Sequence, residues 1–415
     1  MTKTNFYDVR GGRFHMNVKS GLFYWQTTFP HNHAKYGPLE ENIECDYVIV
    51  GSGVSGAQSA YFLSKYGASV VVVDKRKIAH GSTITNTGLI QYTNDKPLFT
   101  CINSFGKENA VRFYQLCLEA VNGIEQITKS LEIDSNFVKR KSLYFASDQA
   151  GKEMLEAEYK ALVENSFPVE KLSKEEIKKK YHFEKELALY TSNDAELNPF
   201  KYVHGILQYV TKRDVKVFSE TEVKSLIGTN YGVELFTDKH FSIKAKKVIF
   251  AGGYESLELK NDKNAILSST YAIVTEAFLK NEAWYQNSLI WETARPYLYL
   301  RTTNDGRVIV GGLDEFTVIP KQRDAMLHHK KDQLLKSLIE LFPMYKDIKI
   351  EYYWTGLFGS THTGLPMIRE YPEYPNCYFL MGFGGSGMVY SYIFAKIICD
   401  LLMTGFNPDA HIFMN

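Results

Sequence analysis

The sequence has few cysteines, no long apolar run and almost no net charge. Its 415 residues include five scattered cysteines, with no C-x-x-C pair and no spacing typical of a metal site. A disulfide framework is therefore not expected, and a reducing compartment is. No apolar run approaches the length that spans a bilayer, and the N-terminal region lacks the apolar core of a signal peptide. These absences predict a cytoplasmic protein with no membrane span.

The charged residues nearly cancel, since 48 Lys and Arg stand against 47 Asp and Glu. This balance offers no basic surface, so no nucleic-acid partner is expected. His31 and His33 are either metal ligands or surface histidines; without a third ligand nearby, no metal site is predicted. The chain is longer than a single core sustains, so we expect two domains.

One segment, residues 46–76, has the pattern of a complete β-α-β unit. An apolar run at 47–50 leads into Gly51, Gly53 and Gly56, which have the spacing G-x-G-x-x-G. In this motif the glycines permit a tight turn, the close approach of a pyrophosphate, and close packing of the next helix on the strand. A second apolar strand ends at Asp74, where a carboxylate can accept hydrogen bonds from ribose hydroxyls and repel a 2′-phosphate. The segment predicts a dinucleotide site; the alternative is a glycine-bearing turn in an ordinary α/β protein.

Further along the chain the pattern changes several times. Residues 1–44 predict an extended arm, residues 97–180 are mostly helical, and strand-like alternation returns at residue 215. A strand then ends in Ala251, Gly252 and Gly253, which suits either a second crossing of a dinucleotide site or a plain turn.

Residues 291–312 predict a hairpin, because Asn-Asp-Gly turn residues separate two β-rich runs. Its period of two places Tyr297, Tyr299 and Arg301 on one face. This face is either exposed to solvent or the wall of a site for a polar or anionic ligand.

A second glycine-rich turn lies near the C-terminus, in the sequence GFGGSG at residues 382–387. It separates a strand from an apolar helix that begins at about Met388. The positive end of that helix favours negative charge near the glycines, so a ligand role is predicted.

Together these motifs resemble the FAD-dependent oxidoreductases of the D-amino-acid oxidase family. The resemblance covers nearly the whole chain, and it includes AHGSTITNTG at 79–88, AELNPFKYVHGIL at 195–207 and the final GFGGSG. The arm and the C-terminal motifs look most like the gamma-glutamylputrescine oxidase branch. The implied fold is α/β (α+β overall), a Rossmann-like FAD-binding domain with an inserted antiparallel-sheet substrate domain. We expect the FAD-binding domain to comprise 45–100, 200–262 and 345–415, and the substrate-binding domain 101–199 and 263–344.

The resemblance implies non-covalent FAD and assigns its contacts to matching positions. The expected cofactor-binding residues are Gly51, Ser52, Gly53, Ser55, Gly56, Asp74, Lys75, Ser82, Thr83, Asn86, Thr87, Gly88, Val223, Ala251, Gly252, Gly356, Gly384, Gly385, Ser386, Gly387 and Met388.

The substrate side departs from the family pattern. Where relatives place an arginine that binds the substrate carboxylate, this chain has Phe358, and an apolar ring cannot pair with a carboxylate. Either Arg301 or another cation replaces it, or the substrate is not a simple α-amino acid. The expected substrate-side residues are Arg301, Tyr299, Phe358 and His362, although an ordinary loop histidine is the alternative for His362.

The function implied is oxidation of a C–N bond in a small amine or amino acid by hydride transfer to FAD, followed by hydrolysis of the imine. Oxygen or another acceptor would take the electrons. Two alternatives stay open: a non-catalytic flavin-binding subunit of a complex, and an NAD-dependent dehydrogenase.

Overall fold

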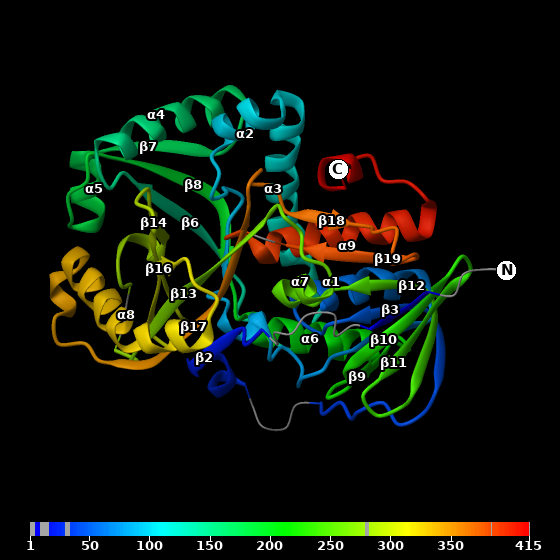
Figure 1. The fold of residues 1–415 in the computed structure, drawn as a ribbon. Helices are drawn as coiled ribbons and strands as arrows, with labels where there is room; N and C mark the ends of the chain where they lie inside the picture. The colour runs from blue at the N-terminus through cyan, green and yellow to red at the C-terminus, as the bar shows by residue number, and fades with distance from the viewer. Residues whose placement is uncertain (1–4, 9–15, 30–33, 279–281, 383, 415) are drawn as a thin grey trace.

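The computed structural model describes residues 5–8, 16–29, 34–278, 282–382 and 384–414. His31 and His33 lie outside the described residues. The chain builds two large sheets that lie side by side (Figure 1).

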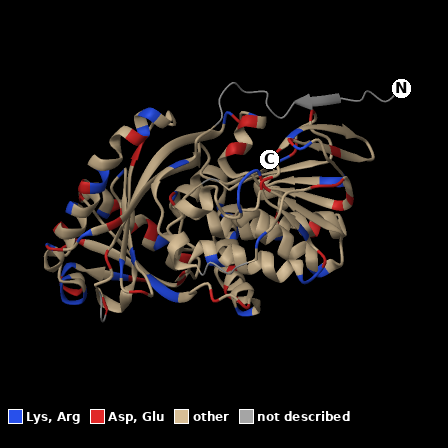
Figure 2. Ribbon diagram, turned by 90° about the horizontal axis from the view of Figure 1, so that it is seen from below, with Lys and Arg blue, Asp and Glu red and all other residues tan. Residues whose placement is uncertain are grey.

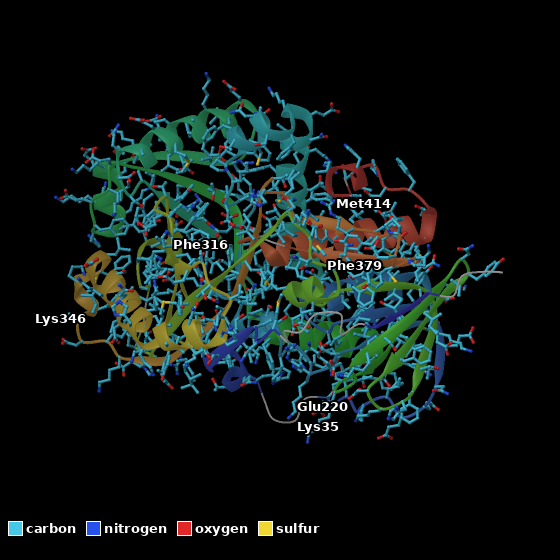
Figure 3. All side chains as sticks on the ribbon, in the orientation of Figure 1. Lys35, Glu220, Phe316, Lys346, Phe379 and Met414 are labelled. Atoms are coloured by element: carbon cyan, nitrogen blue, oxygen red, sulfur yellow. The ribbon has the colours of Figure 1, made fainter. Side chains whose placement is uncertain are left out.

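The first sheet has a parallel centre formed by β19, β12, β3, β4 and β9. Its strands are β1 (Asn5–Asp8), β3 (Ile43–Val50), β4 (Val70–Val73), β9 (Lys216–Phe218), β10 (Val223–Thr229), β11 (Gly232–Thr237), β12 (Ser242–Phe250), β18 (Met367–Arg369) and β19 (Cys377–Met381). Strand β4 is four consecutive valines, all buried, as expected of a strand covered on both faces. Phe379 of β19, labelled in Figure 3, is fully buried against Phe250, with ring centroids 4.7 Å apart.

Three helices cover the parallel centre near the predicted dinucleotide motif. Helix α1 (Val54–Leu63) packs against α6 (Pro199–Thr211) and α9 (Gly387–Thr404), and α9 packs in turn against α3 (Lys107–Ser130). Within the described residues, α9 alone is long and apolar enough to cross a membrane by composition, and 56% of that stretch is buried. Its burial against α1 and α3 is typical of a core helix.

The second sheet is mainly antiparallel. Its strands are β2 (Lys19–Leu22), β5 (Leu89–Ile90), β6 (Val138–Phe145), β7 (Val169–Ser173), β8 (Leu187–Glu196), β13 (Ala265–Thr275), β14 (Leu289–Glu292), β15 (Leu298–Thr302), β16 (Val308–Glu315) and β17 (Ile350–Thr361). The remaining helices are α2 (Leu98–Phe105), α4 (Gln149–Glu164), α5 (Lys174–Tyr181), α7 (Ser256–Leu259), α8 (Pro320–Leu341) and α10 (Ala410–Phe413). Helix α8 packs against β13, β16 and β17. The predicted α/β fold with an additional antiparallel sheet is confirmed.

Two local expectations can be compared with the strand pairing. The predicted hairpin is present: β15 and β16 pair from Leu298↔Gly312 to Thr302↔Val308, on either side of the Asn-Asp-Gly turn. Strand β17 pairs with β13 in the second sheet, although its residues fall in the stretch expected for the FAD-binding domain. This differs from the expected domain boundary at residue 345, because β17 adds an antiparallel strand beside β13 in the second sheet. The chain returns to the first sheet only at β18.

The arm is more integrated than an extended segment lying on the surface. Strand β2 pairs with β17, and Tyr24 and Trp25 are 3% and 2% exposed. Positions of Lys and Arg and positions of Asp and Glu are interspersed along the ribbon in both halves of the molecule (Figure 2). The even distribution agrees with the near-zero net charge of the sequence.

Candidate active site

A cavity of about 240 Å³ opens at the carboxyl ends of β3, β4 and β12. Its wall includes thirteen of the predicted cofactor residues: Gly51, Gly53, Ser55, Asp74, Lys75, Ser82, Thr83, Asn86, Val223, Ala251, Gly252, Gly387 and Met388. Parallel strands commonly bind ligands at this end, in the crevice beyond the sheet. We call this space the first cavity.

The glycines of the first motif shape this cavity by allowing backbone to approach backbone. Gly51 has a φ of 114°, and a Cβ there would lie 2.5 Å from the carbonyl oxygen of Ala251. A Cβ on Gly56 would lie 1.8 Å from the carbonyl oxygen of Gly51. Gly53 is the N-cap of α1 and lines the cavity with Val54 and Ser55, so the positive end of this helix faces the space. The N–H of Val54 donates to the Thr83 hydroxyl at 3.2 Å. Ser52 and Gly56 do not line the cavity and support it from behind.

Asp74 directly follows β4 and is half-buried beside the first glycine turn. Its carboxylate accepts hydrogen bonds from the backbone N–H and the hydroxyl of Ser52, both at 2.7 Å, and from the N–H of Arg76 at 2.8 Å. Burial raises the pKa of Asp74, and these donors oppose the shift. The neighbouring cations are held by Glu255, which lies 2.9 Å from Lys75 and 2.5 Å from Arg76. Nothing in the sequence indicated this Glu255 cluster, because it forms between loops far apart in the chain.

A second cavity of about 140 Å³ adjoins the first, sharing Ser82, Asn86, Tyr254 and Gly387 in its wall. Its other lining residues are Thr85, Thr87, Leu89, Gln91, Thr93, Asn94, Asp95, Thr270, Trp291, Tyr297, Tyr299, Asp314, Leu357, Phe358, Gly384, Gly385 and Ser386. A ligand longer than either cavity can therefore extend through both. The predicted Thr87, Gly384, Gly385 and Ser386 belong to this second cavity.

The C-terminal glycine turn lies at the junction of the two cavities. Gly384 has a φ of 123°, and a Cβ there would lie 2.8 Å from the Tyr390 ring. The N–H of Gly385 donates to the carboxylate of Asp95 at 2.6 Å. Helix α9 starts at Gly387 with no side-chain cap on its first N–H groups. Its positive end therefore faces the junction, as the sequence predicted.

Three side chains hold the loop at residues 85–88 from behind. The indole N–H of Trp354 donates to the carbonyl of Thr85 at 3.0 Å, and that of Trp25 to the carbonyl of Asn86 at 2.7 Å. Arg301 donates to the carbonyls of Thr87 and Gly88 at 3.2 and 2.8 Å.

The position of Arg301 differs from the expectation that it faces the substrate. The side chain is 2% exposed and does not line the second cavity. Besides the loop, its guanidinium bonds to the carbonyls of Leu197 at 2.8 Å and Thr302 at 2.9 Å, and lies 3.6 Å from the Glu196 carboxylate. These donors therefore bind groups of the protein itself. The expectation that Arg301 contacts the substrate is corrected: the side chain supports the loop at residues 85–88.

The other predicted residues are divided between wall and surface. Tyr299 and Phe358 line the second cavity. His362 is exposed in a turn after β17 and lines neither cavity, so it does not reach the site. Gly88 and Gly356 also lie outside both walls; a Cβ on Gly356 would lie 2.8 Å from the Thr85 hydroxyl, so this glycine lets β17 approach the loop.

The residues of the second cavity for which the sequence predicted no role include Asp95, Tyr254, Trp291 and Asp314. Asp95 and Asp314 both place carboxylates in a wall that otherwise combines aromatic rings with uncharged polar residues and glycines. Burial, reinforced by the charge of Asp95, raises the pKa of Asp314 to about 6. The sequence does show that Asp314 follows the Gly-Gly pair of strand β16. The face of the sheet to which its side chain points could not be predicted, because the strand is irregular there.

Comparison with known proteins agrees with this geometry. The family model for FAD dependent oxidoreductases (DAO) matches residues 46–401. The chain is 25% identical over 381 residues to gamma-glutamylputrescine oxidoreductase of Escherichia coli (strain K12), covering 90% of this chain and 87% of that protein. It is 23% identical over 404 residues to a Bacillus subtilis (strain 168) protein named putative Rieske 2Fe-2S iron-sulfur protein YhfW, covering 94% and 74%. Glycine oxidase from Geobacillus kaustophilus has the same fold, with a TM-score of 0.74, 17% identity, and coverage of 90% and 98%.

Proposed function

The chain belongs to the FAD-dependent oxidoreductases of the D-amino-acid oxidase family, and from this premise we propose that it oxidises a carbon–nitrogen bond in a small amine or amino acid. The observation that carries the proposal is the junction of a dinucleotide cradle with a second cavity, partly lined by aromatic rings, at the start of α9. FAD, when bound, supplies the acceptor for the hydride that leaves the carbon bearing the nitrogen, and water then hydrolyses the imine.

The first cavity fits the ADP half of FAD. Its backbone approaches at Gly51 and Gly56 leave no room for a Cβ, and the positive end of α1 faces the place proposed for the pyrophosphate. We assign the ribose hydroxyls to Asp74 and a backbone contact with adenine to Val223. The other cofactor residues keep the assignments made from the sequence, with Ser52, Gly56, Gly88 and Gly356 in supporting positions.

The second cavity suits the substrate. Tyr299 and Phe358 lie in its wall, and we propose that they contact the substrate. Their rings exclude water from the reacting carbon, which strengthens electrostatic interactions inside the cavity. The positive end of α9, at Gly385 to Gly387, stabilises negative charge that develops during the reaction.

Several further assignments follow from the same arrangement. We propose that FAD is held non-covalently: among the described residues no cysteine and no histidine lines either cavity, and all five cysteines are buried and free. The first sheet with its helices would form the FAD-binding domain and the second sheet the substrate-binding domain.

Free cysteines support a cytoplasmic location. The electron acceptor is oxygen or another carrier, and the name of the Bacillus subtilis relative makes an iron–sulfur protein one carrier to test.

An absorbance spectrum of the purified protein tests this proposal. Flavin bands that acid precipitation releases into the supernatant would support non-covalent FAD, whereas bands that stay in the pellet would contradict it. Anaerobic mixing with amines, N-methyl amino acids and D-amino acids should bleach the flavin with one substrate class. Flavin that is bleached by dithionite but by none of these compounds would refute amine oxidation and favour a non-catalytic subunit.

A further inference from the structure

We propose that the substrate is a diamine, with a second positively charged amino group where an amino acid carries its carboxylate. The inference rests on the proposed function, because it names the substrate class of the same cavity. It starts from the charge of the wall. The carboxylates of Asp95 and Asp314 line the second cavity, and no Lys, Arg or His of the described chain does.

Neither carboxylate is neutralised by an ion pair within the part of the chain that the structure describes. Two cations, Arg295 and Lys330, act on Asp314 from outside the cavity wall. Lys330 pairs with the adjacent Glu315, and Arg295 donates to the backbone carbonyls of Ala294 and Asp95. Asp95 accepts the N–H of Gly385, which is a neutral donor. Two carboxylates that share a small cavity without a cation repel each other, and a bound cation relieves that repulsion.

A β-bulge directs Asp314 into the cavity. Two residues of β16, Leu313 and Asp314, lie opposite a single residue of β13, Thr270. Leu313 has a φ of 56°, which is strained for a leucine. Bulges of this kind redirect a side chain and are frequent beside active sites. Thr270, across the bulge, hydrogen-bonds to the Asp314 side chain and also to Tyr299, so the carboxylate is held in place at the wall.

The rest of the wall suits an organic cation. Trp291 and Tyr297 lie edge to face, with ring centroids 6.3 Å apart and planes at 77°, and both line the cavity beside Tyr299. Aromatic ring faces attract ammonium groups. Thr93, 8% exposed, also lines the cavity, and its hydroxyl has no hydrogen-bond partner among the described residues. A ligand ammonium supplies the missing donor.

A substrate carboxylate would find no cationic side chain in the described wall of the second cavity. Phe358 lines the wall, and Arg301 is bound to backbone carbonyls outside it. Arg295 lies beside Tyr297 but donates to the carbonyls of Ala294 at 2.9 Å and Asp95 at 3.3 Å. A carboxylate would therefore face the like charges of Asp95 and Asp314, which disfavours amino acids and favours diamines.

Anaerobic titration of the FAD-loaded protein tests this inference with putrescine, butylamine and γ-aminobutyrate. These compounds share one carbon chain and one amine, and end in an ammonium, a methyl and a carboxylate group. Perturbation of the oxidised flavin spectrum measures binding, and bleaching measures oxidation. We expect putrescine to bind about 10–100-fold more tightly than butylamine, as for a hydrogen bond to a charged group, and γ-aminobutyrate to bind most weakly.

Two variants locate the effect. Asp314→Asn should weaken putrescine binding about tenfold or more while leaving butylamine binding unchanged. Glu315→Gln is the matched control, because its carboxylate pairs with Lys330 away from the cavity, and it should change neither affinity. If Asp314→Asn does not fold, the relative affinities of the three compounds for the unmodified protein still test whether the site prefers a diamine.

The outcomes separate this inference from the proposed function. Equal binding of the three compounds, tighter binding of γ-aminobutyrate, or no spectral response to any of them would overturn the diamine assignment. Bleaching by an α-amino acid without diamine binding would leave amine oxidation intact and refute only the diamine. Putrescine binding that depends on Asp314, without bleaching by any amine, would uphold the cation site and refute the oxidation.

Discussion

Replacement of Arg301 by alanine separates a structural role from a substrate role for this guanidinium. In the structure it bonds to the carbonyls of Thr87, Gly88 and Leu197, and it lies 3.6 Å from Glu196, which is fully buried. Removing one partner of a buried ion pair costs about 3–5 kcal/mol, because the other charge stays buried. Arg140 still contacts Glu196 at 2.9 Å, so the lower half of that range is expected.

The loss can be expressed as a melting temperature. With an unfolding entropy of about 2.1 cal/mol/K per residue, a chain of this length should melt about 3–5 °C lower after a loss of about 3–4 kcal/mol. Because Arg301 holds the loop at 85–88, FAD affinity should fall as well. Thermal unfolding followed by flavin fluorescence measures both effects.

Arg213→Ala is a suitable control, since Arg213 is exposed and its loss should change stability by less than about 0.5 kcal/mol. The reasoning is refuted if Arg301→Ala keeps the melting temperature and FAD affinity of the unmodified protein but weakens substrate binding. That result would mean that the guanidinium faces the substrate.

Three further changes test other parts of the site. Gly56→Ala should yield protein without flavin absorbance, because the new Cβ would lie 1.8 Å from the carbonyl oxygen of Gly51; normal FAD content in this variant would contradict the tight helix packing. His362→Ala should leave turnover unchanged in a steady-state assay, because the side chain is exposed and outside both cavities; a tenfold loss of turnover would show that it reaches the substrate. Binding of diamines should weaken as the pH falls below about 6, because only the ionised Asp314 carboxylate binds a cation strongly. Burial and the charge of Asp95 raise the pKa of Asp314 to about 6, while the charges of Arg295 and Lys330 act to lower it. Titrations from pH 5 to 8 measure this dependence, and an inflection that persists in Asp314→Asn would assign it to another group.

The cofactor half of the molecule could be predicted because its constraints are local. Gly51 and Gly56 follow a buried strand at a fixed spacing, and the backbone approaches that require them lie within one β-α-β unit. The C-terminal glycine turn was predictable for the same reason: the strand, the turn and the helix are consecutive. Patterns of this kind do not depend on the rest of the fold.

The substrate half depends on contacts between distant segments. Alternation placed Tyr299 and Arg301 on one face, which was the basis for the expected role of Arg301. Alternation alone could not show that the loop at 85–88 would use the donors of Arg301. Asp314 was missed because a bulge interrupts the regular alternation of β16.

The most direct test of the central claim is the product formed in a single anaerobic turnover. The FAD-loaded protein is mixed with excess putrescine, and the carbonyl compound and ammonia released are counted against the flavin that is bleached. Oxidation of the C–N bond predicts one carbonyl compound and one ammonia for each bleached flavin. Bleaching without either product, or product without bleaching, would contradict amine oxidation by the bound FAD.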